Sequence, residues 1–104
     1  MKVILKSRND THYASGIYDG TTLTVLKGSK INPFLKFDAM PQAIISLRND
    51  VEYVDKTGVT KKDIEFNSPT SAAQFITGRS VNGYIAWRID DKISLKEYRE
   101  QNSK

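Results

Sequence analysis

The chain has 104 residues, of which 38% are hydrophobic and 27% are charged, values that suit one folded domain and exclude a disordered chain. No apolar run is long enough to span a membrane, and residues 1–6 are too short for a signal peptide, so we expect a single cytoplasmic domain over residues 1–104. The absence of cysteine excludes a disulfide, a thiolate nucleophile and a cysteine zinc site.

The net charge of +4 is concentrated near the beginning of the chain. Residues 1–36 contain six basic and two acidic side chains, whereas the remainder contains ten of each. An excess of this kind forms either a basic patch that attracts phosphate or an ordinary solubilising surface. Both interpretations remain open from the sequence.

The first third of the chain has the pattern of short strands. Residues 2–6 predict a strand, with a loosely attached chain end as the alternative. Asp19-Gly20 then separates two β-prone runs, residues 14–18 and 21–26. This dipeptide suits a type I′ hairpin turn, because glycine tolerates the positive φ that the turn requires.

The middle of the chain predicts a helix between polar segments. Asp38 is a suitable N-cap for a helix that runs to about Asp50, with Pro41 tolerated in its first turn. We expect residues 51–54 to leave this helix as a strand. A turn over residues 55–58 and a strand containing Ile64 and Phe66 follow.

The segment 66–87 has the densest set of structural signals. Ser68 and Pro69 predict a helix start, and Gly78 predicts its end, because glycine readily adopts the left-handed conformation. We expect Asn82-Gly83 to form a turn before a strand over residues 84–89, with Trp87 in the core.

A last helix is predicted near the C-terminus. Ser94 and Glu97 have the spacing of a capping box, in which each side chain binds the other's backbone amide. Together the elements predict an α+β fold: a small, mostly antiparallel sheet of about five short strands with two to three helices.

Several of these segments also support a family resemblance. They are Ala-Ser-Gly at 14–16, a hydrophobic strand that ends in Gly-Ser at 23–29, the segment Phe-Asn-Ser-Pro-Thr-Ser-Ala-Ala at 66–73, and Gly-Arg-Ser-Val-Asn-Gly-Tyr-Ile-Ala-Trp at 78–87. Over residues 14–97 the chain resembles the small domain of unknown function found C-terminal to GIY-YIG endonuclease domains. It resembles more distantly the domain associated with restriction-enzyme adenine methylases. The resemblance implies an accessory domain in restriction, repair or defence, with a nuclease or methylase as partner. The chain is then either a stand-alone member or a piece of a longer protein.

Catalytic chemistry is not expected. Gly16-Ile17-Tyr18 is not followed by the Tyr-Ile-Gly that the nuclease needs, and the one histidine, His12, has no second histidine near it. A metal site requires several converging ligands, and a serine nucleophile requires a base, neither of which the sequence indicates. We therefore expect no enzyme activity, no metal and no cofactor.

Nucleic-acid binding, to DNA in particular, is the leading functional hypothesis. Arg79 either relieves the negative end of the helix before it or contacts DNA, and the start of that helix either binds phosphate or is simply capped. Tyr84 and Arg88 would share an open strand face. The candidate residues are Lys27, Ser29, Lys30, Ser68, Thr70, Arg79, Ser80, Asn82, Tyr84 and Arg88.

The alternative hypothesis is a protein-interaction or self-association module that binds no nucleic acid. Phe34, Leu35 and Phe37 are three large apolar residues close together in a loop. They would either form an exposed contact surface or fold in beneath the sheet.

Overall fold

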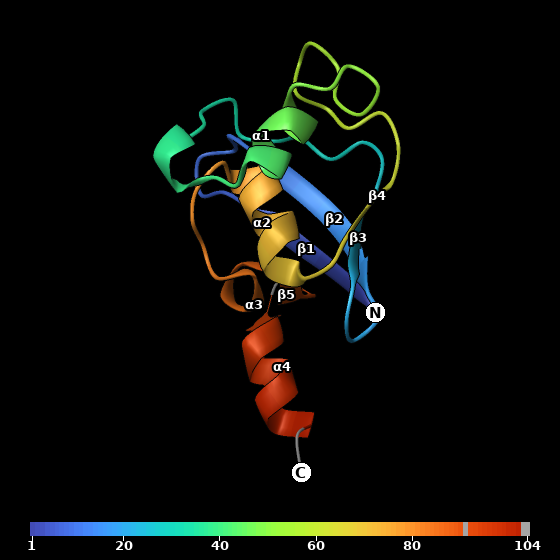
Figure 1. Ribbon diagram of the computed structural model, residues 1–104. Coiled ribbons are helices and arrows are strands. Elements are labelled where there is room, and N and C mark those ends of the chain that lie inside the picture. The colour runs from blue at the N-terminus through green and yellow to red at the C-terminus, as the bar shows by residue number, and fades with distance from the viewer. Residues whose placement is uncertain (91, 103–104) are drawn as a thin grey trace.

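A computed structural model describes residues 1–90 and 92–102 of the protein (Figure 1). The chain forms one antiparallel sheet of six strands in the order β4-β3-β2-β1-β5-β6. The strands are β1 (Lys2–Lys6), β2 (Tyr13–Tyr18), β3 (Leu23–Val25), β4 (Ile64–Phe66), β5 (Arg88–Ile89) and β6 (Ile93–Ser94).

Four α-helices and one 3-10 helix complete the fold within the described residues. The α-helices are α1 (Gln42–Arg48), α2 (Pro69–Thr77), α3 (Gly83–Ala86) and α4 (Leu95–Asn102), and the 3-10 helix covers Phe37–Ala39. The predicted α+β class is confirmed. The sheet has six strands instead of about five, because β5 and β6 form an additional two-residue pair.

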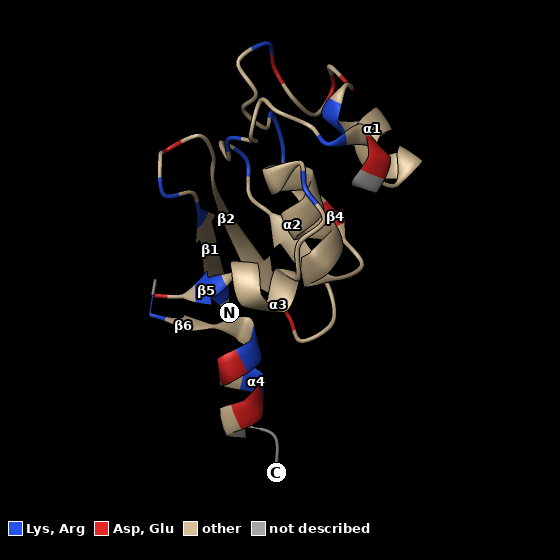
Figure 2. Cartoon of the chain, turned by 90° about the vertical axis from the view of Figure 1, so that its left-hand side faces the viewer, with Lys and Arg blue, Asp and Glu red and all other residues tan. Residues whose placement is uncertain are grey.

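The helices cover one face of the sheet (Figures 1 and 2). Alternate residues of the long strands point to this face and are buried, as Val3 and Leu5 do on β1 and Ala14 does on β2. Phe75 and Ile76 of α2 meet them and are fully buried. Because side chains of a strand alternate between faces, the intervening residues lie on the opposite face, which none of the described helices covers (Figures 1 and 2).

β1 lies in the interior of the sheet, between β2 and β5, so the prediction of a strand there is confirmed. The hairpin between β2 and β3 is also confirmed, but its turn is not type I′. Gly20 has a positive φ of 101°, whereas Asp19 does not; its carboxylate instead accepts hydrogen bonds from the Thr21 and Thr22 amides at 2.8 and 2.7 Å. The type I′ turn requires positive φ at both central residues.

Two predictions for the middle of the chain were wrong. The helix begins at Gln42 after Pro41 and ends at Arg48, so Asp38 lies in the separate 3-10 helix and caps nothing. Proline prevents the preceding residue from adopting helical geometry readily, which explains the break. Residues 51–53 form a turn, and Val54 makes only an isolated bridge to Thr60 instead of a strand.

The predicted strand over residues 84–89 was wrong for most of its length. Asn82 caps α3 by accepting a hydrogen bond from the Tyr84 amide at 3.0 Å, and the strand begins only at Arg88. Trp87 is fully buried as predicted, but Ile85 is half exposed. The alternation of apolar residues was therefore a helical turn followed by a buried cap residue.

α4 extends away from the sheet (Figure 1) and begins at the predicted capping box. The Glu97 amide donates to Ser94 Oγ at 3.2 Å, and Glu97 Oε1 accepts from the Ser94 amide at 3.4 Å. Neither α4 nor any other helix in the described part of the chain has the length and apolar character needed to cross a bilayer.

Candidate functional site

The segment 66–87 holds the fold together through contacts between two elements. Thr70 Oγ1 accepts a hydrogen bond from the Gly83 amide at 3.1 Å, and the Trp87 indole N–H donates to the Pro69 carbonyl at 3.0 Å. An atom added at the Cβ position of Gly83 would lie 2.2 Å from the Pro69 carbonyl oxygen, a distance that no side chain permits. α3 is thereby locked onto the first turn of α2.

This arrangement occupies the helix start that the sequence offered as a phosphate site. Ser68 Oγ accepts from the Ser71 amide at 3.2 Å, so its role as the N-cap is confirmed. The backbone of Gly83 lies against Pro69 and Thr70. The hydroxyls of Ser68 and Thr70 are therefore engaged within the protein.

Three more of the candidate residues have structural roles or lie elsewhere. Ser29 is 2% exposed, and its hydroxyl donates to the Leu26 carbonyl at 2.8 Å. Asn82 caps α3, as described above. Lys27 is exposed beside Asp63, whose carboxylate accepts a hydrogen bond from the Lys27 amide at 2.8 Å.

Arg79 and Arg88, in contrast, contribute to one continuous basic region. Three adjoining hollows share lining residues. The first contains Arg88 and Arg8, the second contains Arg8 together with Arg79 and Phe34, and the third contains Arg79 and Phe34 again. Among the described residues, no aspartate or glutamate lines any of the three. Ser80 also lines the third hollow. The exposed basic side chains that line the three hollows are Lys6, Arg8, Lys36, Arg79 and Arg88.

The same region continues onto the uncovered sheet face. Tyr13 is paired with Lys6 of β1 on one side and forms an isolated bridge with Lys30 on the other. Residues directly opposite one another in a sheet project to the same face, so Tyr13 stands between two lysines. Arg88 of β5 is paired with Ile4 of β1 and lies on this face as well.

We call this region the cationic surface and define it by six exposed basic residues. It also exposes two aromatic rings, since the side chain of Phe34 is 74% exposed and that of Tyr13 is 49% exposed. No carboxylate in residues 1–90 and 92–102 forms an ion pair with the guanidinium groups at positions 8, 79 and 88. The six basic residues are Lys6, Arg8, Lys30, Lys36, Arg79 and Arg88.

Two groups near the cationic surface, His12 and Arg48, have pKa values lowered chiefly by burial. Burial, followed by the positive charges of Arg79 and Arg48, lowers the pKa of His12 from its ordinary value. Arg48 is 8% exposed; its Nη2 donates to the Asn32 carbonyl, and its Nη1 has no hydrogen-bond partner in the described structure. Burying a guanidinium without a carboxylate partner is unfavourable. Among the described residues the buried charge of Arg48 therefore has no carboxylate to compensate it.

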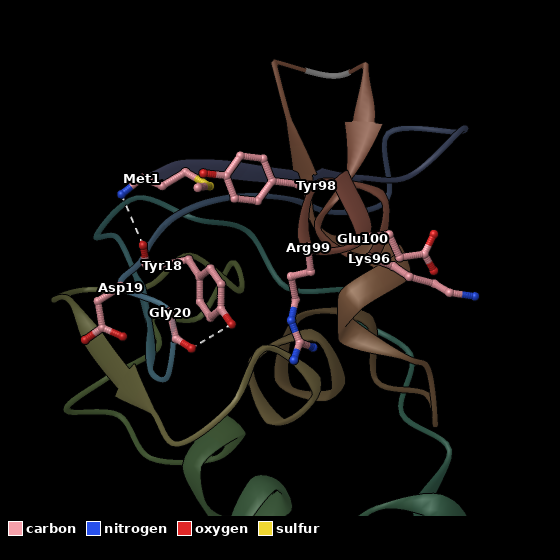
Figure 3. A pocket seen from close by; sticks show the side chains of 8 residues that line it. All are labelled: Met1, Tyr18, Asp19, Gly20, Lys96, Tyr98, Arg99 and Glu100. Atoms are coloured by element: carbon pink, nitrogen blue, oxygen red, sulfur yellow. Dashed lines mark hydrogen bonds between the residues drawn. The ribbon is translucent and has the colours of Figure 1, made fainter. Parts of the chain in front are cut away.

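Tyr84 does not belong to the cationic surface. It lies on α3, where the Arg99 guanidinium of α4 stacks 4.3 Å from the centre of its ring. Arg99 also lines a separate hollow between the β2–β3 hairpin and α4 (Figure 3). That hollow contains Asp19 and Glu100 as well as Lys96, so it has no charge of one sign to select a ligand.

The sequence thus indicated part of the cationic surface and missed the rest. Lys6, Arg8 and Lys36 were counted in the basic excess of residues 1–36 but not proposed as contacts. Phe34 was considered only for protein docking, and Tyr13 carried no signal. Their common location depends on strand register and on the loop that runs beside the end of α2, which a single sequence does not define.

One family model, described as a domain of unknown function (DUF4357), matches residues 4–99 of the chain. No curated protein and no solved structure matches it. The match agrees with the resemblance to a domain of unknown function that the motifs indicated.

Proposed function

The chain belongs to the DUF4357 family, and we propose that it is a non-catalytic accessory domain that binds nucleic acid, DNA in the first instance. The observation that supports this proposal is the cationic surface. Six exposed basic residues from β1, β5 and three loops converge there, and its hollows are lined by no acidic side chain of the described chain. A polyanion that contacts several cations releases its own counterions, which favours binding at moderate salt.

The buried Arg48 supports the same conclusion. Its charge has no carboxylate partner among the described residues, and it lowers the pKa of nearby His12. A phosphate bound at the cationic surface would bring a compensating negative charge close to both groups. Ligand binding would then also stabilise the fold, because the ligand binds the folded state alone.

The setting of the domain follows from the resemblance alone. A neighbouring nuclease or methylase would supply the chemistry in a restriction, repair or defence system, while this domain holds the nucleic acid. The hydroxyl of Ser68 is engaged in capping α2 and therefore has a structural role.

The test is a titration of isotope-labelled protein with a short oligonucleotide, followed by backbone amide NMR at low and physiological salt. We expect shifts near Arg8, Arg79 and Arg88 that weaken steeply with salt. The double variant Arg79→Ala/Arg88→Ala should bind less tightly and reduce the salt slope by about two, since each lost phosphate contact lowers it by about one.

A matched control removes the same charge elsewhere. Lys27 and Lys96 are both exposed and lie outside the three hollows of the cationic surface. Lys27→Ala/Lys96→Ala should retain most of the affinity. Equal losses in the two double variants would mean that net charge, and not the cationic surface, causes binding.

A second candidate function is protein docking through apolar side chains. Phe34 and Phe37 are 74% and 64% exposed, so they do not fold in beneath the sheet. If no oligonucleotide shifts any amide at either salt concentration, this apolar contact becomes the leading candidate. Light scattering after size-exclusion chromatography would then test whether the partner is a second copy of the chain.

A further inference from the structure

The position of Phe34 within the cationic surface indicates the form of nucleic acid that fits there. Its side chain lines two of the three hollows, together with Arg79 in both of them. An exposed aromatic ring among cations offers stacking to a base whose face is free, whereas bases inside a duplex already stack on one another. Resting on the proposed function, we propose that the cationic surface binds single-stranded nucleic acid, with Phe34 as a stacking platform for an unpaired base.

The loop that carries Phe34 is held rigidly, as a stacking platform requires. The Asn32 amide donates to the Ile76 carbonyl at 2.8 Å, and the Lys36 amide donates to the Gly78 carbonyl at 2.9 Å. Between these points the Asn32 side chain bonds both the Thr77 carbonyl and the Phe34 amide, each at 3.1 Å. The loop is thereby tied to the end of α2 on both sides of Phe34. The ring is exposed although its backbone is fixed.

Tyr13 provides a second ring on the sheet face. It stands between Lys6 of β1 and Lys30, with which it forms an isolated bridge, and is half exposed. The hollow that Arg8 and Arg88 line begins at Lys6, and the next one extends to Phe34. A single strand can place its phosphates on the cations and its unpaired bases on the rings, whereas the bases of a duplex already stack on one another.

The part of the molecule best shaped to enter a duplex groove lacks the charge to do so. α4 projects from the body of the protein (Figure 1). Its basic residues Lys96 and Arg99 are balanced by the acidic Glu97 and Glu100. A helix that enters the major groove is normally rich in positive charge. The concentration of cations on the sheet face and beside Phe34 therefore favours a single strand over a duplex.

The experiment compares four oligonucleotides of about a dozen nucleotides, a length within the usual single-strand site size. They are oligothymidylate, oligouridylate, a mixed-sequence DNA duplex and a DNA strand in which every base is absent but the sugar-phosphate backbone is retained. We expect the thymidylate strand to bind about tenfold more tightly than the strand without bases, the effect of one stacked base. The Phe34 ring protons should shift upfield only when bases are present. A preference between thymidylate and uridylate reflects the sugar and the thymine methyl group together, and it supports a single strand in either case.

Two variants locate the stack. Phe34→Ala should remove most of the tenfold advantage of bases while leaving binding of the strand without bases unchanged. Phe37→Ala is the matched control, because Phe37 is a similarly exposed phenylalanine outside the three hollows. Tyr13→Ala should cause a smaller loss of the same kind.

The failure of this inference differs from the failure of nucleic-acid binding itself. The single-strand inference would be overturned if the duplex bound more tightly than thymidylate and uridylate, or if thymidylate and the strand without bases bound equally. Either result would leave the proposed function intact. An unchanged affinity of Phe34→Ala for thymidylate would do the same. No binding of any of the four would overturn both.

Discussion

The segment 66–87 and the cationic surface differ in almost every physical respect. The segment is recognisable in the sequence, and its side chains Ala72, Phe75 and Trp87 are completely buried. The residues of the cationic surface are exposed and scattered along the chain from Lys6 to Arg88. The first region determines how α2 and α3 meet, and the second provides most of the surface chemistry that we assign to function.

The comparison shows that a distinctive motif need not be a functional site. Within it, polar side chains and a glycine satisfy backbone groups or allow close contact between helices, namely Ser68, Thr70, Asn82 and Gly83. Only Arg79 and Ser80 of this segment line the hollows beside it while exposed to solvent. Substitutions in the segment should therefore change stability, and substitutions on the cationic surface should change binding.

Among the substitutions that test this division, the replacement of Trp87 by alanine should cause the largest loss of stability. The side chain is fully buried and its indole N–H donates to the Pro69 carbonyl. We expect Trp87→Ala to lower the free energy of unfolding by about 3 to 5 kcal/mol, enough to unfold much of a small domain. Urea denaturation measures this loss.

The variant Trp87→Phe separates packing from the hydrogen bond. It retains much of the aromatic volume but removes the indole N–H that donates to the Pro69 carbonyl, so about 1 kcal/mol should be lost with this hydrogen bond. An unchanged unfolding midpoint in Trp87→Ala would contradict the structural role of the segment and place the indole among the candidates for binding.

A smaller loss is expected from Gly83→Ala. The added Cβ would lie 2.2 Å from the Pro69 carbonyl oxygen and 2.3 Å from the Thr70 nitrogen, so α3 must move away from α2. We expect about 3 kcal/mol of destabilisation, the upper part of the usual range for overpacking. Thermal unfolding monitored by circular dichroism would measure it.

Ile85→Ala on the same helix is the control, because this side chain is half exposed. It should change stability by less than about 1 kcal/mol. If Gly83→Ala were as stable as the control, the close contact between the two helices would not be required by the fold.

How far the sequence predicted these regions depended on the range of the interactions involved. Caps are local, and Ser68, Gly78 and Ser94 were assigned correctly because each acts on backbone groups within a few residues. Asp38 failed as a cap because Pro41 delayed the helix start. The strand expected at 84–89 failed because the Asn82 cap and the contact with α2 stabilise a helical turn where apolar alternation favoured a strand.

The cationic surface could be predicted only in part, since it depends on long-range pairing. The basic excess of residues 1–36 indicated that a patch was possible. The location of Lys30 beside Tyr13 requires the bridge between them, and that of Phe34 beside Arg79 requires the contact of the loop with the end of α2. None of these contacts connects residues close in sequence.

The smallest expected effect, and the sharpest test of where phosphate binds, involves His12. Burial and the charges of Arg79 and Arg48 lower its pKa below the ordinary value of about 6.5. The unfolded chain therefore takes up a proton first as the pH falls through that value, and the folded state should lose stability from there down to the folded pKa. Phosphates bound beside Arg79 would oppose its field and raise the pKa of His12.

Because the chain has one histidine, its ring-proton shifts followed by NMR report this pKa without ambiguity. A higher pKa in the complex requires, by linkage, that binding becomes tighter as the pH falls through the same range. Arg79→Ala should raise the pKa in the free protein and reduce the further rise on binding, whereas Lys27→Ala should change neither. If a complex forms and the pKa of His12 does not change, the bound phosphates do not lie beside Arg79. The contact would then be restricted to the sheet face around Lys6, Tyr13 and Arg88.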